Sequence, residues 1–159
     1  MHSAHHKPEL TLDLPSEADT LALGAGIARG LAPGMVVFLS GELGAGKTTL
    51  ARGILRGLGH TGRIKSPSFT LVEVYKLSRL YLYHFDFYRF NSPMELEDAG
   101  FREIFDGEAV CLVEWPEKAG AALPAADLKI SIRAAGTGRR VEMIAATEAG
   151  KACLRHIPR

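Results

Sequence analysis

Residues 41–48 read Gly-Glu-Leu-Gly-Ala-Gly-Lys-Thr and match the phosphate-binding pattern G-x-x-x-x-G-K-[ST] at every fixed position. In such a segment the glycines let backbone N–H groups converge on phosphate oxygens, and the N-terminus of the following helix adds a favourable dipole. Lys47 is expected to reach the β- and γ-phosphates, and the Thr48 hydroxyl to ligate Mg²⁺. The chain is therefore predicted to bind a nucleoside triphosphate through Glu42, Leu43, Gly44, Ala45, Gly46, Lys47, Thr48 and Thr49.

The residues on either side of this motif have the patterns that it requires. Met35–Leu39 is a short apolar run rich in strand formers, and residues 49–58 carry apolar side chains at helical spacing. Strand, glycine loop and helix form the context in which the motif binds phosphate. The alternative, a glycine turn that happens to carry Lys-Thr before a helix, is disfavoured because both flanks fit.

Phosphoryl chemistry also needs a carboxylate that holds Mg²⁺ and a group that orients the nucleophile. Two predicted strands end on acids, Asp86 and Glu114, and ligand sites lie beyond the carboxyl ends of parallel strands. We therefore expect both acids beside the phosphates, although each could instead be a surface acid at a strand end. Glu42, Asp98 and Asp106 are weaker candidates, because the first lies inside the loop and the others lie near helix ends.

Two missing elements narrow the nucleotide and the mechanism. The chain contains no glutamine, the residue that positions water in many GTPases. Its single asparagine, Asn91, begins Asn-Ser-Pro-Met, so a guanine-reading Asn-Lys-x-Asp element is absent. ATP is therefore favoured over GTP, and activation of water falls to a carboxylate, with Glu114 favoured, or to a group from outside the chain.

Two further segments carry polar groups that could serve the site. Ser66–Thr70 places hydroxyls in a proline-stiffened segment, which is either a switch-like loop near the γ-phosphate or an ordinary loop that enters a strand. His84–Arg89 interleaves aromatic residues with His, Asp and Arg. Taken alone, His84 is more often a structural histidine than a catalyst, and Tyr88 more often packs.

The elements that must position these residues form one α/β domain with a mixed parallel and antiparallel sheet flanked by helices. Turn residues at Ser78-Arg79 and Gly136–Gly138 predict two hairpins, which lie outside the parallel strands. A helix is expected from Ser16 to about Leu31, another after the phosphate motif, and a third from Ser92 to Gly100. The expected strands are 10–14, 35–39, 71–75, 80–86, 109–114, 127–133 and 140–145.

Length and composition fit a single globular domain, expected over residues 10–159 after a disordered leader of residues 1–9. The net charge of +1 provides no strong footprint for nucleic acid or for an anionic membrane. Cys111 and Cys153 lack a metal-type spacing and are expected to be idle thiols in a reducing compartment. No apolar run approaches the 18 residues of a membrane span and no signal layout is present, so we expect a cytoplasmic protein.

Together these segments resemble the TsaE (formerly YjeE) family, small bacterial ATPases required for threonylcarbamoyladenosine formation in tRNA. The resemblance covers roughly Leu10–Ala146 and rests on residues 41–49, 66–69, 84–89 and 113–117, in matching order and spacing. One departure is Ser68, where the family usually has threonine. The hydroxyl survives, so a phosphate or Mg²⁺ contact remains possible there.

The resemblance implies a small P-loop domain that binds ATP and Mg²⁺ and hydrolyses ATP weakly alone. It implies a catalytic set of Glu114, Lys47 and Ser68, with Ser68 in the switch-like position, and a metal set of Thr48, Asp86 and Glu114. It implies TsaD and TsaB as protein partners, with tRNA adenosine 37 modified by the complex and met only indirectly. Trp115 lies near either the nucleotide or the partner.

Two other functions remain open at this stage. A small-metabolite kinase could use the same phosphate loop, with Arg133, Arg139 and Arg140 as a lid over the transferred group. The same arginines could equally flank an exposed turn. A nucleotide-gated binding module with negligible chemistry is the third reading.

Overall fold

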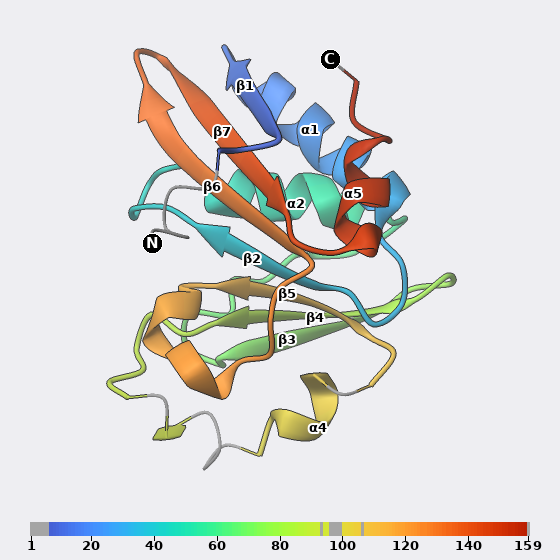
Figure 1. Ribbon diagram of the computed structural model, residues 1–159, viewed down its shortest axis with the longest axis vertical. Coiled ribbons are helices and arrows are strands. Elements are labelled where there is room, and N and C mark those ends of the chain that lie inside the picture. Colours follow the sequence, from blue (N-terminus) through green and yellow to red (C-terminus); the bar gives the residue numbers. More distant parts are fainter. Residues whose placement is uncertain (1–6, 93, 96–99, 106, 159) are drawn as a thin grey trace.

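The computed structural model describes residues 7–92, 94–95, 100–105 and 107–158, and Figure 1 shows how its helices and strands are arranged. The expected helix from Ser92 and the weaker acid candidates Asp98 and Asp106 lie wholly or largely outside the described residues, as does most of the expected leader. The elements are β1 Leu10–Leu14, α1 Glu17–Gly30, β2 Val36–Ser40, α2 Lys47–Gly57, β3 Val72–Lys76, β4 Tyr81–Asp86, α4 Arg102–Phe105, β5 Val110–Glu114, the 3₁₀ turns η2 Pro116–Lys118 and η3 Gly120–Ala122, β6 Leu128–Ala135, β7 Gly138–Ala145 and α5 Glu148–Leu154.

Within the part of the chain that the structure describes, seven strands form one sheet in the order β1-β7-β6-β2-β5-β4-β3. The central strand β2 runs parallel to β6 and β5, and β5 runs parallel to β4. The outer pairs β1–β7, β6–β7 and β3–β4 are antiparallel. The predicted mixed sheet is therefore confirmed, with its parallel strands next to the phosphate motif and its hairpins outside them.

Local signals set the helices that flank the loop. The side chain of Ser16 accepts the Asp19 N–H at the start of α1, and the Asp19 carboxylate accepts the Ser16 N–H, so the predicted capping box forms. Helix α2 ends at Gly57, and Gly59 follows in the left-handed region at φ 99°, as expected of a terminating glycine. Helix α1 packs against α2 on one face of the sheet (Figure 1).

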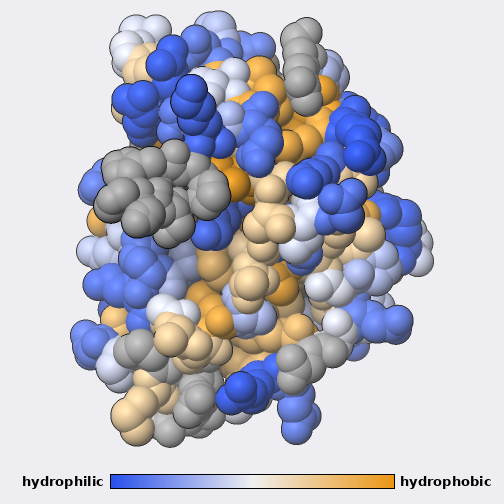
Figure 2. Space-filling model, in the orientation of Figure 1, coloured by the Kyte–Doolittle hydropathy of each residue, from blue (hydrophilic) through white to orange (hydrophobic). Residues whose placement is uncertain are grey.

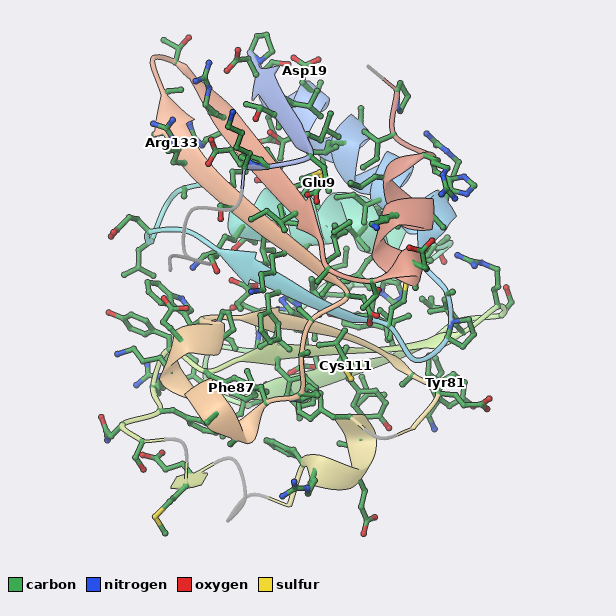
Figure 3. The ribbon with its side chains drawn as sticks, viewed as in Figure 1. Glu9, Asp19, Tyr81, Phe87, Cys111 and Arg133 are labelled. Atoms are coloured by element: carbon green, nitrogen blue, oxygen red, sulfur yellow. The ribbon has the colours of Figure 1, made fainter. Side chains whose placement is uncertain are left out.

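The two faces of the sheet bury different side chains. Leu39, Leu82 and Leu112 join the aliphatic core beneath α1, α2 and α5. The opposite face carries an aromatic cluster that includes Phe85, Phe87 and the thiol-bearing Cys111, and Figure 3 shows the last two inside the lower half of the molecule. The surface in this orientation is mixed, with hydrophilic residues around the periphery and apolar residues toward the middle (Figure 2).

Two local features differ from the expectations drawn from sequence. Glu9, expected in a leader, is tied to β7, because its N–H donates to Met143 O and its carboxylate accepts the Ala145 N–H. Helix α5 was not predicted, although Thr147 caps it by accepting the Gly150 N–H. No described helix has the length and apolar character needed to cross a membrane.

Candidate functional site

The register of the parallel strands brings the two predicted acids together. Asp86 at the end of β4 pairs directly with Glu114 at the end of β5, and Glu114 pairs in turn with Leu39 of β2. Both carboxylates lie on the α2 side of the sheet, because Leu82 and Leu112 of the same strand faces pack beneath that helix. The chain passes from β2 into the phosphate loop at this same edge.

The phosphate loop has the backbone that its sequence predicts. Gly44 and Gly46 adopt φ values of 80° and 111°, a region that residues with a side chain rarely enter. Helix α2 then begins at Lys47, and its N-cap Gly46 supplies no side-chain hydrogen bond to the first N–H groups. These N–H groups are consequently available to an anion, and the helix dipole favours one there.

Lys47 is buried, with 5% of its surface exposed. Its Nζ donates to the Gly41 carbonyl at 2.6 Å and lies 3.8 Å from the centre of the Trp115 ring. Burial lowers the pKa of Lys47, and the nearby Glu114 and Asp86 carboxylates partly oppose that shift. The ammonium is therefore held between the loop backbone, an aromatic face and two acids.

Trp115 was predicted to lie near either the nucleotide or the partner, and its ring lines the cavity at the loop. Its backbone is left-handed, with φ 56°, directly after β5 and directly before Pro116. The ring also lies 4.9 Å from the ring of Tyr88, centre to centre. This strained turn places an aromatic wall beside Lys47.

Asp86 is buried, and its Oδ1 accepts the Tyr88 N–H at 2.9 Å. Burial raises the pKa of this carboxyl, the Tyr88 hydrogen bond lowers it, and the neighbouring Glu114 raises it further. A positive charge placed beside Asp86 would stabilise its ionised form. The arrangement therefore suits a cation ligand.

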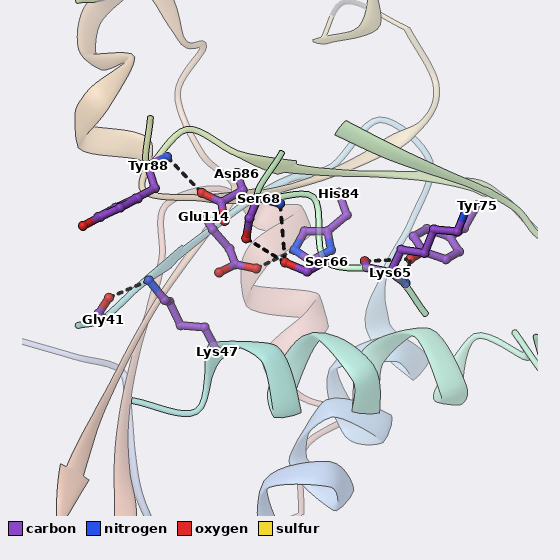
Figure 4. A network of polar contacts seen from close by, with 10 residues as sticks. All are labelled: Gly41, Lys47, Lys65, Ser66, Ser68, Tyr75, His84, Asp86, Tyr88 and Glu114. Atoms are coloured by element: carbon purple, nitrogen blue, oxygen red, sulfur yellow. Dashed lines mark hydrogen bonds and ion pairs between the residues drawn. The ribbon is translucent and has the colours of Figure 1, made fainter. Parts of the chain in front are cut away.

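Glu114 forms a buried pair with His84. Its Oε2 lies 2.6 Å from His84 Nε2, and the side chains are 7% and 4% exposed. His84 and Asp86 are two residues apart on β4, so strand alternation places them on the same face. Figure 4 shows His84, Glu114 and Asp86 above the start of α2, with Lys47 opposite.

Ser68 lies on the loop segment that borders this cluster. Its hydroxyl is 2.7 Å from that of Ser66, and its carbonyl accepts the Arg89 Nε–H at 3.1 Å. The Arg89 guanidinium also lies 4.5 Å from the centre of the Phe69 ring. These contacts tie the segment to Arg89, three residues after the end of β4, although Phe69 itself is exposed.

One cavity of about 300 Å³ brings most of the predicted residues together. Of the predicted set, Glu42 and Ala45 are not part of its lining: Glu42 borders a neighbouring cavity, and Ala45 packs into the aliphatic core. A larger cavity of about 590 Å³ lies near Arg79 and Tyr81, at the other end of the strands, and contains none of the motif residues. The predicted residues that do line the first cavity are Leu43, Gly44, Gly46, Lys47, Thr48, Thr49, Ser68, Asp86 and Glu114.

Two residues of this cavity, His84 and Arg139, were not among the site residues predicted from the sequence. His84 was interpreted as structural, yet it holds the candidate base, and its place two residues before Asp86 on one strand was the available signal. Arg139 was considered only as part of a kinase lid, but its Nη2 donates to Gly44 O at 3.4 Å. No local pattern identifies Arg139, because the contact depends on how β7 packs beside the loop.

Comparisons with known proteins agree with this site. The family model described as threonylcarbamoyl adenosine biosynthesis protein TsaE matches residues 14–141. The chain belongs to the TsaE family. The matched range contains the phosphate loop and both site acids, so the resemblance drawn from the motifs is confirmed.

Two tRNA threonylcarbamoyladenosine biosynthesis proteins TsaE illustrate the similarity. The protein from Haemophilus influenzae is 44% identical over 147 residues, which cover 89% of this chain and 93% of the relative. The protein from Bacillus subtilis is 44% identical over 127 residues, 79% of this chain and 77% of the relative. The fold is similar to the crystal structure of Bacillus subtilis YdiB, with a TM-score of 0.79, 35% identity and coverage of 94% and 95% of the two chains. The predicted P-loop-like α/β fold of this TsaE-family chain is thereby confirmed.

Proposed function

We propose that this protein binds ATP and Mg²⁺, hydrolyses ATP, and supports threonylcarbamoyl transfer to adenosine 37 of tRNA as a partner of TsaB–TsaD. The observation that carries the proposal is the direct pairing of Asp86 with Glu114 at the strand ends, facing Lys47 at the start of α2. Membership of the TsaE family supports the pathway. Phosphoryl chemistry needs this combination of cation, metal-side acid and second carboxylate.

The residues present fit a magnesium ion. The Thr48 hydroxyl and the Asp86 carboxylate supply hard oxygen ligands on one cavity, with Glu114 beside them. Mg²⁺ is usually held by one or two carboxylates together with substrate phosphates. When bound, the ion supplies positive charge against the phosphate oxygens. Burial raises the pKa of Asp86, and the Tyr88 hydrogen bond and the charges of His84 and Lys47 offset this only in part, so a bound metal ion would further favour the ionised carboxylate.

Lys47 and the loop would hold the phosphates. To reach a phosphate oxygen, the Lys47 ammonium must exchange its hydrogen bond with the Gly41 carbonyl for one to the ligand. The Trp115 ring limits how far the ammonium can swing and excludes water from one side. Lys47 then neutralises charge in a site where burial strengthens every electrostatic contact.

Glu114 is the best candidate to orient and deprotonate water. His84 occupies its Oε2, while its Oε1 accepts no hydrogen bond from any described residue. A carboxylate fixed through one oxygen presents the other in a constant direction, which suits a general base. Arg139 beside Gly44 adds a second positive charge at the loop.

The proposal is tested by measuring ATP hydrolysis by the purified protein, alone and with TsaB–TsaD and tRNA. We expect slow turnover alone, faster turnover in the mixture, and a loss of roughly 10²–10⁴-fold in Glu114→Ala if it acts as the base. The matched control is Glu108→Ala, an exposed acid just before the same strand, which should turn over normally. A rate of ATP hydrolysis that is the same with and without TsaB–TsaD and tRNA would refute the proposed role in tRNA modification.

The kinase alternative has less support. Of its three lid candidates, Arg139 contacts the phosphate loop, but Arg140 pairs with Asp13 at 2.9 Å on the surface. A panel of small metabolites incubated with ATP and the protein distinguishes the two functions. A phosphorylated acceptor would support the kinase, whereas phosphate release without one supports the ATPase. Complex assembly that depends on Glu114 without any turnover would instead indicate the binding module.

A further inference from the structure

His84 carries a buried nitrogen that the proposed mechanism does not use. Its Nε2 is engaged by Glu114, while Nδ1 is buried and has no hydrogen-bond partner among the described residues. The His84 side chain is 4% exposed, so bulk water does not provide Nδ1 with a hydrogen-bond partner. Buried polar atoms without a partner are uncommon in folded proteins, and each calls for an explanation.

The pairing with Glu114 fixes what kind of group Nδ1 requires. A carboxylate oxygen only accepts, so the hydrogen of the short contact is on Nε2 of the ring. In the neutral imidazole the other nitrogen is then an acceptor. With the ring neutral, Nδ1 therefore requires a hydroxyl or N–H donor.

Ser66 and Ser68 are hydroxyl donors that line the same cavity as His84. Their Oγ atoms are 2.7 Å apart, and Ser66 Oγ also accepts the Ser68 N–H at 3.4 Å. Either hydroxyl can be the donor in the contact between the two serines; when Ser68 donates, the hydrogen of the Ser66 hydroxyl is free to donate elsewhere. Figure 4 draws the two serines joined by dashed lines and, separately, His84 joined to Glu114.

This segment is held at both ends. Tyr75, on β3, exchanges hydrogen bonds with the backbone of Lys65, since its hydroxyl accepts the Lys65 N–H at 3.2 Å and donates to the Lys65 carbonyl at 3.4 Å. Arg89 donates to the Ser68 carbonyl at the other end. The two serines are thereby held at the lining of the cavity that also contains His84.

We propose that His84 is a positioning residue that connects the Ser66–Ser68 segment to Glu114 through a chain of hydrogen bonds. In the connected arrangement, the Ser68 hydroxyl donates to Ser66 Oγ and His84 Nε2–H donates to Glu114 Oε2. The Ser66 hydroxyl then moves toward the ring and donates to His84 Nδ1, which has no partner among the described residues in the present structure. No proton is transferred along these hydrogen bonds. Their effect is to make the direction of the Glu114 carboxylate depend on where the loop segment lies.

The inference rests on the proposed function, because Glu114 is taken as the group that orients water. A loop segment that contacts the terminal phosphate would then tighten the chain and align Glu114 only when that phosphate is present. The hydrogen bonds thus connect the binding of phosphate at the loop to the orientation of the Glu114 carboxylate. A purely structural histidine would show no such dependence on Ser66.

The kinetic test compares Ser66→Ala, His84→Gln and the double variant. Gln keeps a donor where Nε2 lies but lacks the Nδ1 acceptor, and Ser66 is exposed, so both variants should fold. We expect each to lower kcat roughly two- to tenfold with KM for ATP unchanged, the size of one hydrogen bond. The double variant should be no slower than the slower single variant, since both remove the same contact. Additive losses, or an unchanged kcat in Ser66→Ala, would overturn the proposal.

A second measurement needs no turnover. In ¹⁵N NMR of the ring nitrogens, His84, assigned by the signal lost in His84→Gln, should be the neutral Nε2–H tautomer with Nδ1 shifted by an accepted hydrogen bond. Ser66→Ala should move the Nδ1 signal, while Ser78→Ala, a serine in the β3–β4 turn, should not. An Nδ1 signal that stays unchanged in Ser66→Ala would refute the proposed hydrogen-bond connection, even if the protein hydrolyses ATP. If the Nδ1 signal moves in Ser66→Ala but the protein does not hydrolyse ATP, the hydrogen-bond connection stands and only the proposed function is refuted.

Discussion

Replacing Gly24 by alanine should force α1 away from α2 and disturb the phosphate loop from a distance. A Cβ at Gly24 would lie 2.7 Å from Gly53 Cα and 2.7 Å from Ile54 N, both backbone atoms of α2. Carbon atoms in contact normally stand about 3.5–4.0 Å apart, so the helices must separate by roughly 1 Å. Neither obstacle is the end of a flexible side chain, and the helices therefore have to move.

The size of the effect follows from two opposing terms. Overpacking of this kind costs about 1–3 kcal/mol, whereas alanine favours a helix over glycine by about 0.5–1 kcal/mol. We expect a net loss of roughly 1–2 kcal/mol in the free energy of unfolding. In a chain of 159 residues this corresponds to a fall in Tm of about 2–8 °C.

Gly26 provides a control on the same helix. A Cβ there would lie 3.5 Å from Arg29 Nη2 and 3.6 Å from Pro158 Cδ, which is ordinary contact. Gly26→Ala should therefore raise stability by up to about 1 kcal/mol through helix propensity alone.

Urea unfolding of both variants measures these changes, and ATP affinity reports on the loop, because Lys47 begins the displaced helix. Gly24→Ala should unfold at a lower urea midpoint and bind ATP more weakly, whereas Gly26→Ala should bind ATP normally. Equal shifts in the two variants would show that the close crossing of α1 and α2 does not limit the packing.

Three further outcomes are expected. Lys47→Ala should reduce ATP turnover roughly 10²–10³-fold while leaving the fold intact by circular dichroism, and unchanged turnover would remove it from the site. Burial raises the pKa of Asp86 above the ordinary 3.8, so between these two values the native state binds more protons than the unfolded chain and stability falls as pH rises. Asp86→Asn should abolish that fall in urea unfolding measured across acidic pH, while ATP binding loses its dependence on Mg²⁺; a retained fall would assign it to another group. Burial raises the pKa of Cys111 to about 12 and that of Cys153 to about 11, so a thiol reagent at pH 8 should modify neither in the native protein and both after unfolding. Rapid labelling of the native protein would contradict the burial of these thiols.

Short-range signals in the sequence determined the parts of this protein that depend only on neighbouring residues. The glycine loop with Lys47 and Thr48 needs glycine freedom, a preceding strand and a following helix, all encoded within about 25 residues. The capping box of Ser16 and the hairpin turns are equally local. For the same reason Asp86 and Glu114 could be recognised as strand ends, although their contact could not.

Tertiary structure decided which of these residues meet. The pairing of Asp86 with Glu114 depends on strand register, which is fixed by the packing of whole faces and not by the residues themselves. The bond from His84 to Glu114 and the contact of Arg139 with Gly44 join segments far apart in the chain. A periodic pattern shows which face of a strand is buried, but not what lies across from it. The sequence therefore indicated what single residues could do chemically, whereas tertiary packing determined which of them form one site.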